Sequence, residues 1–101
     1  MRFENQVAVV TGAGRGIGHA IAVRLAKEGA RVAAVSRSET AQRTADEINA
    51  DRADSAKAYA VDVSDHTAVQ QTSAKILKDF GRIDILVNNA GVTRDGLSMR
   101  M

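Results

Sequence analysis

The sequence contains no cysteine, proline or tryptophan, and its aromatic side chains are limited to Phe3, Tyr59 and Phe80. The absence of cysteine excludes a disulfide framework, a thiol nucleophile and any thiolate metal site. Three aromatic residues are too few for a platform on which nucleic-acid bases stack. No apolar run approaches the roughly 18 residues that a membrane-spanning helix needs, and residues 1–5 do not resemble the start of a signal peptide. We therefore expect a cytoplasmic protein that does not bind membranes.

The charged residues show no excess of one sign. The 14 Lys and Arg residues and 12 Asp and Glu residues give a formal net charge of +2, and the basic residues are scattered from Arg2 to Arg100. Binding of nucleic acid normally needs clustered positive charge, so we expect no nucleic-acid partner. With 45% hydrophobic and 26% charged residues over 101 positions, the composition is that of one small globular unit.

Short apolar runs alternate with amphipathic segments along the chain. The runs at 7–10, 32–35, 58–61 and 83–87 predict strands that are buried on both faces, as in parallel sheets. Three helices are expected between them, with these apolar faces: Ile17, Ile21 and Leu25; Ala41, Ala45 and Ile48; Val69, Ile76, Leu77 and Phe80. This alternation predicts an α/β fold, a doubly wound parallel sheet joined by right-handed crossovers.

The expected helix ends carry ordinary signals. Gly29 and Gly81 stand where a glycine closes a helix, and Ser64 is placed to cap the start of the third helix. The strand at 83–87 would form an apolar edge of the sheet with unpaired backbone groups.

Polar or glycine-rich segments follow each predicted strand, at 11–18, 36–37, 62–63 and 88–91. In a parallel α/β sheet, ligands bind beyond the carboxyl ends of the strands. The sequence therefore predicts one binding site to which four loops contribute.

The first of these loops has the composition of a phosphate-binding turn. Gly12, Gly14, Gly16 and Gly18 lie within seven residues, between a strand and a helix. Glycine permits a positive φ and a close approach of the backbone, and the helix start offers N–H groups to an anion. The spacing is not G-x-G-x-x-G, because Ile17 stands in place of the last glycine, and no Gly-Lys-Ser/Thr of a P-loop follows. The alternative, a turn that merely connects strand and helix, is disfavoured by the three companion loops.

Residues 11–18 read TGAGRGIG, and residues 88–91 read NNAG. These two motifs, with Asp62 and Val63 after the third strand, resemble the cofactor site of short-chain dehydrogenases/reductases. The segment GVTRDGLSMRM at 91–101 is similar to bacterial 3-oxoacyl-[acyl-carrier-protein] reductases. The resemblance spans the chain from Phe3 and implies a Rossmann-like sheet, here truncated after its fourth strand. Residues 1–101 would then be the N-terminal NAD(P)-binding portion of a single domain whose catalytic portion is absent.

The resemblance implies a role for each matched position. Gly12 and Gly16 would pass under the pyrophosphate, and Gly18 would let the helix pack close to the sheet. Asn88 is expected to tie the fourth strand to its neighbours. The cofactor-binding residues expected in this way are Gly12, Gly14, Arg15, Gly16, Ile17, Gly18, Ser36, Arg37, Asp62, Val63, Asn89, Ala90 and Gly91.

Two of these positions keep a second interpretation. Arg15 is a candidate partner for the adenosine-side phosphate, or else a solvated loop arginine. Asp62 would accept from the adenine amino group while the Val63 backbone donates, or else it caps the next turn.

The choice of cofactor follows from the end of the second strand. Proteins that prefer NAD place an acidic residue there for the ribose 2′-hydroxyl, whereas this chain has Ser36, Arg37 and Ser38. An arginine binds a 2′-phosphate through charge-assisted hydrogen bonds. We therefore expect NADP(H).

Catalytic residues are expected to be missing. The family reduces carbonyls with a tyrosine, a lysine four residues later, a serine and an asparagine, but here Val63 follows four residues after Tyr59, the only tyrosine. We expect Tyr59 to be a core or edge aromatic, and His19 and His66 to be solvated surface residues with no metal site. This chain alone is thus predicted to be inactive.

The leading hypothesis is the cofactor-binding half of an NADPH-dependent reductase. The parent enzyme would convert a 3-oxoacyl-[acyl-carrier protein] to the (R)-3-hydroxyacyl form in fatty-acid biosynthesis and would form a homo-oligomer. Alternatives are another short-chain dehydrogenase/reductase acting on a different carbonyl or alcohol, a non-catalytic nucleotide-binding module, and a plain structural α/β domain.

Overall fold

The computed structural model describes residues 3–14, 16–62, 64–88 and 98–100. The strands are β1 (Val7–Thr11), β2 (Arg31–Ser36), β3 (Ala56–Ala60), β4 (Ile85–Asn88) and β5 (Ser98–Arg100). The helices are α1 (Gly16–Lys27), α2 (Thr40–Asp51) and α3 (His66–Phe80). In the described part of the chain, no helix is both long and apolar enough to cross a membrane.

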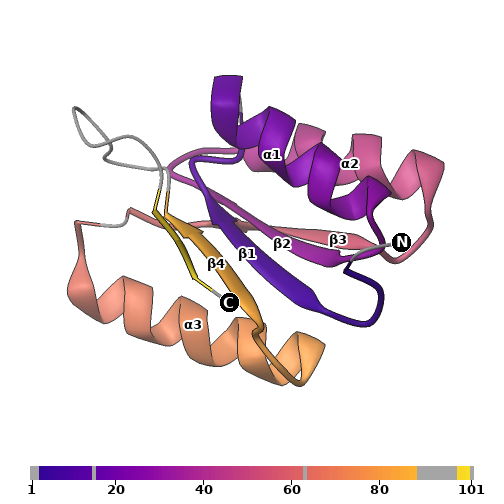
Figure 1. Cartoon of the computed structure of the whole chain (residues 1–101). Coiled ribbons are helices and arrows are strands. Elements are labelled where there is room, and N and C mark those ends of the chain that lie inside the picture. The colour runs from indigo at the N-terminus through magenta and orange to yellow at the C-terminus, as the bar shows by residue number, and fades with distance from the viewer. Residues whose placement is uncertain (1–2, 15, 63, 89–97, 101) are drawn as a thin grey trace.

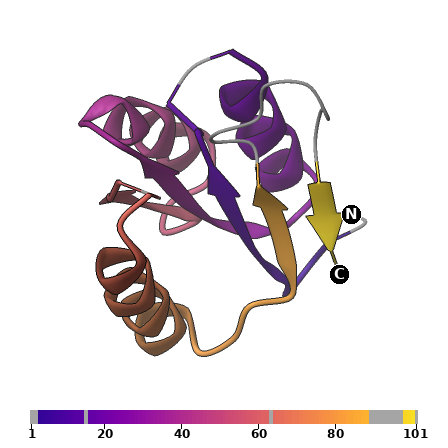
Figure 2. The same ribbon diagram turned by 90° about the vertical axis from the view of Figure 1, so that its left-hand side faces the viewer.

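The sheet has the order β3-β2-β1-β4-β5, and β1 to β4 are parallel. Figures 1 and 2 show α1 and α2 on one face of the sheet and α3 on the other. The predicted α/β, Rossmann-like fold is therefore confirmed, and residues 12–14 and 37–39 follow the carboxyl ends of β1 and β2.

The prediction that the fourth strand forms the edge of the sheet is wrong. β5 pairs with β4 in antiparallel orientation, with Val87 opposite Met99, as Figure 2 shows beside β4. The physical reason is that a strand as apolar as β4 leaves unpaired N–H and C=O groups at an edge, and a returning segment satisfies them.

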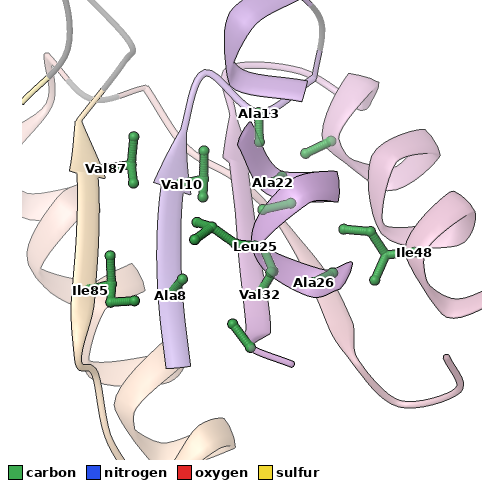
Figure 3. Close-up of a cluster of buried hydrophobic side chains, with 13 residues drawn as sticks. Ala8, Val10, Ala13, Ala22, Leu25, Ala26, Val32, Ile48, Ile85 and Val87 are labelled. Atoms are coloured by element: carbon green, nitrogen blue, oxygen red, sulfur yellow. The ribbon is translucent and has the colours of Figure 1, made fainter. Parts of the chain in front are cut away.

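The core between the sheet and α1/α2 is built from small and branched side chains. Ala8 and Val10 of β1 and Val32 of β2 are completely buried against Ala22 and Leu25 of α1. Figure 3 shows these side chains between the strands and the two helices, with Ile85 and Val87 completing the layer on β4.

The face that α1 buries differs from the prediction. Ile17, expected in the core, is 64% exposed, and the buried residues of α1 are Gly18, Ala22, Leu25 and Ala26. Glycine and alanine let the helix lie close to the sheet, so the small residues face inward and the isoleucine faces out. For α2, the expected residues Ala41, Ala45 and Ile48 are buried, together with Thr44.

Two details of α3 also differ from the prediction. Leu77 is 50% exposed, whereas Ile76 beside it is buried, because the helix turns the 76 position toward the sheet. The cap is Asp65, not Ser64: its side chain accepts a hydrogen bond from the Ala68 N–H at 3.1 Å, while the Ser64 hydroxyl is engaged elsewhere. Gly81 closes the helix as predicted, with φ of 84°.

Candidate functional site

The loop after β1 has the backbone that its glycines predict. Gly12 and Gly16 have φ of 65° and 61°, a conformation that favours glycine. Between them, Ala13 is fully buried and its N–H donates to the Val35 carbonyl of β2 at 3.0 Å. The loop is thus fastened to the sheet at its centre.

Gly14 and Gly16 are required for different reasons. A Cβ at Gly14 would overlap the Thr40 side chain and come within 3.1 Å of the Thr40 carbonyl carbon, whereas one at Gly16 would meet nothing within 4 Å. Gly14 thus allows the close approach of α2, while Gly16 borders open space at the start of α1. An α-helix leaves its first N–H groups without intrahelical partners, and such N–H groups commonly bind phosphate in proteins. Ile17 is exposed at the same helix start, and Gly18 is buried.

Ser36, at the end of β2, shapes the following turn. Its hydroxyl donates to the Ser38 carbonyl at 2.6 Å and accepts from the Ala41 N–H at 3.1 Å. These bonds direct the chain into α2. A direct contact between Ser36 and a cofactor stays a prediction.

Arg37 lines an open hollow of about 660 Å³ beyond the end of β2. A second arginine, Arg43 in the first turns of α2, lines the same hollow, as does the acidic Glu39. Reasoning from the sequence missed Arg43, although its place soon after the loop at 36–38 could have indicated it. Two guanidinium groups at one hollow suit a phosphate ester.

Asp62, after β3, is engaged in its own turn. One carboxylate oxygen accepts from the N–H and the hydroxyl of Ser64, at 3.0 and 2.7 Å. These bonds, with the positive charge of Arg37, hold the pKa of Asp62 below its ordinary value. The turn-capping interpretation is therefore confirmed, and the charge effect indicates that the loops after β2 and β3 are neighbours. The adenine contact stays a prediction.

Five predicted site residues lie outside the described part of the chain: Arg15, Val63, Asn89, Ala90 and Gly91. The backbone of Asn88 is described, and it pairs with Thr11 of β1 and Ser98 of β5. The carboxyl ends of β1 and β4 therefore lie side by side.

Tyr59 is a core aromatic, as expected. It is buried between the sheet and α3, and its hydroxyl donates to the Asp79 carboxylate at 2.7 Å. Burial and this hydrogen bond raise the pKa of Tyr59 above its ordinary value, which keeps the hydroxyl protonated.

The two histidines differ. His66 is exposed, as predicted. The prediction of a solvated surface position is wrong for His19, because its Nδ1 lies 2.8 Å from the buried Thr44 hydroxyl and its side chain is 30% exposed. The sequence carries no signal for this pair, since the two residues are 25 positions apart and meet only through the packing of α1 on α2.

The sequence matches the short chain dehydrogenase family over residues 6–101. The chain belongs to this family. It is 47% identical over 102 residues to 3-oxoacyl-[acyl-carrier-protein] reductase FabG of Escherichia coli K12, and it covers 40% of that protein. It is also 47% identical over 94 residues to D-threitol dehydrogenase of Mycolicibacterium smegmatis, covering 92% of this chain and 36% of the relative.

Solved structures agree with this assignment. A metagenomic short-chain oxidoreductase in complex with NADP superimposes with a TM-score of 0.84 at 44% identity, over 91% of this chain and 42% of the other. The chain thus spans about 40% of the length of the curated reductase it resembles.

Proposed function

We propose that this chain binds NADPH as the N-terminal part of a 3-oxoacyl-[acyl-carrier-protein] reductase. The observation that carries the proposal is the glycine loop with open space at Gly16, next to a hollow lined by Arg37 and Arg43. The 47% identity to the E. coli reductase supports the substrate class, and the similar structure solved with NADP supports the cofactor.

Each part of the proposed site has a physical role. The start of α1 would hold the pyrophosphate through backbone N–H groups. Because Gly16 has no side chain, the space beside these groups is open to the ligand. The ionised Asp62 would accept from the adenine amino group with its carboxylate. When bound, NADPH supplies the hydride that reduces a carbonyl.

Preference for NADPH over NADH would come from charge. The residues at 36–38 include no acid that would repel a 2′-phosphate, and Arg37 and Arg43 are both exposed. The negative charge of Glu39 at the same hollow disfavours a phosphate there, and the guanidinium of Arg43 offsets this charge.

The proton donor of the reduction would come from outside these 101 residues. The only tyrosine of the sequence, Tyr59, is buried, and its hydroxyl donates to the Asp79 carboxylate. We therefore propose that the chain alone binds cofactor without turnover. Residues 1–101 would form one NAD(P)-binding portion of a cytoplasmic homo-oligomer whose substrate is carried by acyl-carrier protein.

The test is titration calorimetry of NADPH and of NADH, each with the unsubstituted 101-residue chain and with the Arg37→Asp variant. Because a charge-assisted hydrogen bond contributes about 1.5–3 kcal/mol, the substitution should raise the NADPH dissociation constant about 10- to 100-fold and change that of NADH little. Lys78→Asp, the same charge reversal on α3, should change neither. Equal changes for both cofactors in Arg37→Asp would contradict the assignment.

A second candidate is a dehydrogenase for another carbonyl or alcohol, favoured by the equal identity to D-threitol dehydrogenase. Assays of the parent protein with an acetoacetyl thioester and with D-threitol separate the two. Cofactor binding by the parent protein without turnover of either compound would instead favour a non-catalytic nucleotide-binding module.

A further inference from the structure

The Thr44 side chain of α2 contacts the glycine loop after β1. Thr44 is fully buried, and its hydroxyl donates to the Ala13 carbonyl at 2.8 Å. The N–H of Ala13 is bonded to the Val35 carbonyl. This one residue is therefore held to β2 through its N–H and to α2 through its carbonyl, and both its neighbours are glycines.

The same hydroxyl fixes the donor on His19. A threonine hydroxyl has one proton, and Thr44 gives it to the Ala13 carbonyl because a carbonyl can only accept. The His19 Nδ1, 2.8 Å from Thr44 Oγ1, must then carry a proton and donate. Nε2 of the ring lies 3.4 Å from Glu47 Oε1, a contact that is attractive when this nitrogen is protonated as well. His19 of α1 and Thr44 of α2 thus form one directed chain of hydrogen bonds that ends on the loop, and Glu47 lies beside its outer end.

We infer that Thr44 is a positioning residue for the phosphate-facing loop and that His19 orients its hydroxyl. This inference rests on the proposed function, because the loop is assigned to the cofactor pyrophosphate. Flexible glycines on both sides of Ala13 would let the loop adopt other conformations. The two bonds on Ala13 select one of them before the ligand arrives, and preorganisation of this kind increases affinity by reducing the ordering that binding requires.

Glu47 contributes less than the two residues nearer the loop. Its side chain is 54% exposed, and exposed ion pairs contribute little. We therefore expect the contribution to NADPH affinity to decrease from Thr44 to His19 to Glu47.

The experiment measures NADPH binding by calorimetry for the parental chain and two matched pairs of variants. Thr44→Val removes the hydroxyl and keeps the shape, whereas Thr44→Ser keeps the hydroxyl. His19→Leu removes the donor, whereas His19→Asn keeps an N–H near the position of Nδ1. We expect about a 5- to 10-fold rise in the NADPH dissociation constant for Thr44→Val and about 3-fold for His19→Leu. The serine and asparagine variants should remain within about twofold of the parental chain.

A second ligand separates positioning from a general loss of structure. Adenosine 2′-monophosphate carries the phosphate expected at Arg37 but no pyrophosphate, so its binding, followed by NMR titration, should change less than about twofold in Thr44→Val. Equal weakening of both ligands would overturn the inference, as would parental NADPH affinity in both Thr44→Val and His19→Leu. If Thr44→Val does not fold, the inference is tested by His19→Leu and His19→Asn alone, because His19 is less buried than Thr44. Failure of the parental chain to bind NADPH would instead overturn the proposed function, and the inference with it.

Discussion

The two faces of the sheet are packed differently. On the α1/α2 face, the side chains are buried and most of them are alanine or valine, and the Thr44 hydroxyl of α2 bonds to the glycine loop. On the α3 face, a hollow of about 250 Å³ lies between β1, β2, β4 and the helix, and Leu86 of β4 is 39% exposed beside it.

The polar contacts between α3 and the sheet lie at the carboxyl end of the helix. Asp79, in the last turn, accepts from Lys57 and Tyr59 of β3, and Arg31 of β2 donates to the Phe80 carbonyl at 3.1 Å. Asp65 caps the other end. The difference indicates that the α1/α2 face determines the geometry of the binding loop. By contrast, α3 packs on the sheet through one fully buried side chain, Ile76, with Val69 and Phe80 partly buried beside it.

Truncation of one buried isoleucine on each face tests this comparison most strongly. Ile85 is completely buried in the α1/α2 core, whereas Ile76 borders the hollow on the other side. We expect Ile85→Ala to lower the free energy of unfolding by about 4 kcal/mol and Ile76→Ala by about 2 kcal/mol, measured by urea unfolding. Leu77→Ala, at a half-exposed position of α3, is the control and should cost far less. An equal or larger loss at Ile76 would contradict the comparison.

Gly14→Ala tests how tightly α2 packs against the loop. The new methyl group would overlap the Thr40 side chain, and overpacking of this kind costs about 1–3 kcal/mol. The free energy of unfolding of the variant, measured in urea, should fall by about 2 kcal/mol. The loss of unfolding free energy in the Gly14→Ala/Thr40→Gly double variant should be about 1 kcal/mol smaller than the sum of the losses in the two single variants. Strict additivity would show that the two residues do not meet.

Acid titration tests the polar end of α3 and gives the smallest effect. The hydrogen bonds from Tyr59 and Lys57 hold the pKa of Asp79 below its ordinary value of 3.8. A carboxyl whose pKa is lowered by folding stabilises the fold above its unfolded pKa, and this stability is lost as the pH falls through the folded pKa. In Asp79→Asn, the stability should therefore decrease less steeply as the pH falls below about 4. Thermal unfolding at several pH values measures this dependence. Tyr59→Phe, which removes the first of these bonds, should flatten it partly. An unchanged acid limb in both variants would contradict the assigned pKa shift.

The sequence predicted β1 to β4 to within two residues, because each contains a short apolar run beside turn residues. The expectation of burial on both faces is wrong for β3, because it is an edge strand and is only partly buried. The sequence also predicted the positions of the glycine loop and Arg37, since both follow directly from strand ends. The buried face of α1 could not be read from hydrophobicity, because close packing selects Gly18 and Ala22 over the larger Ile17. β5 is only three residues long and has no periodic pattern.

The contacts around the loop were beyond sequence reasoning for a different reason. Thr44 reaches Ala13 across 31 positions, and the effect of Arg37 on Asp62 joins loops that follow different strands. Such pairs depend on the distance between packed elements, which no local pattern encodes.

We propose that this chain binds NADPH at the glycine loop and at the hollow lined by Arg37. The most direct measurement is an NMR titration of the isotope-labelled chain with NADPH, following every assigned backbone amide. We expect the largest chemical-shift changes at Gly12, Gly14, Gly16 and Arg37, and little change in the middle of α3. Shifts confined to the hollow beneath α3, or no shifts at millimolar NADPH, would contradict it.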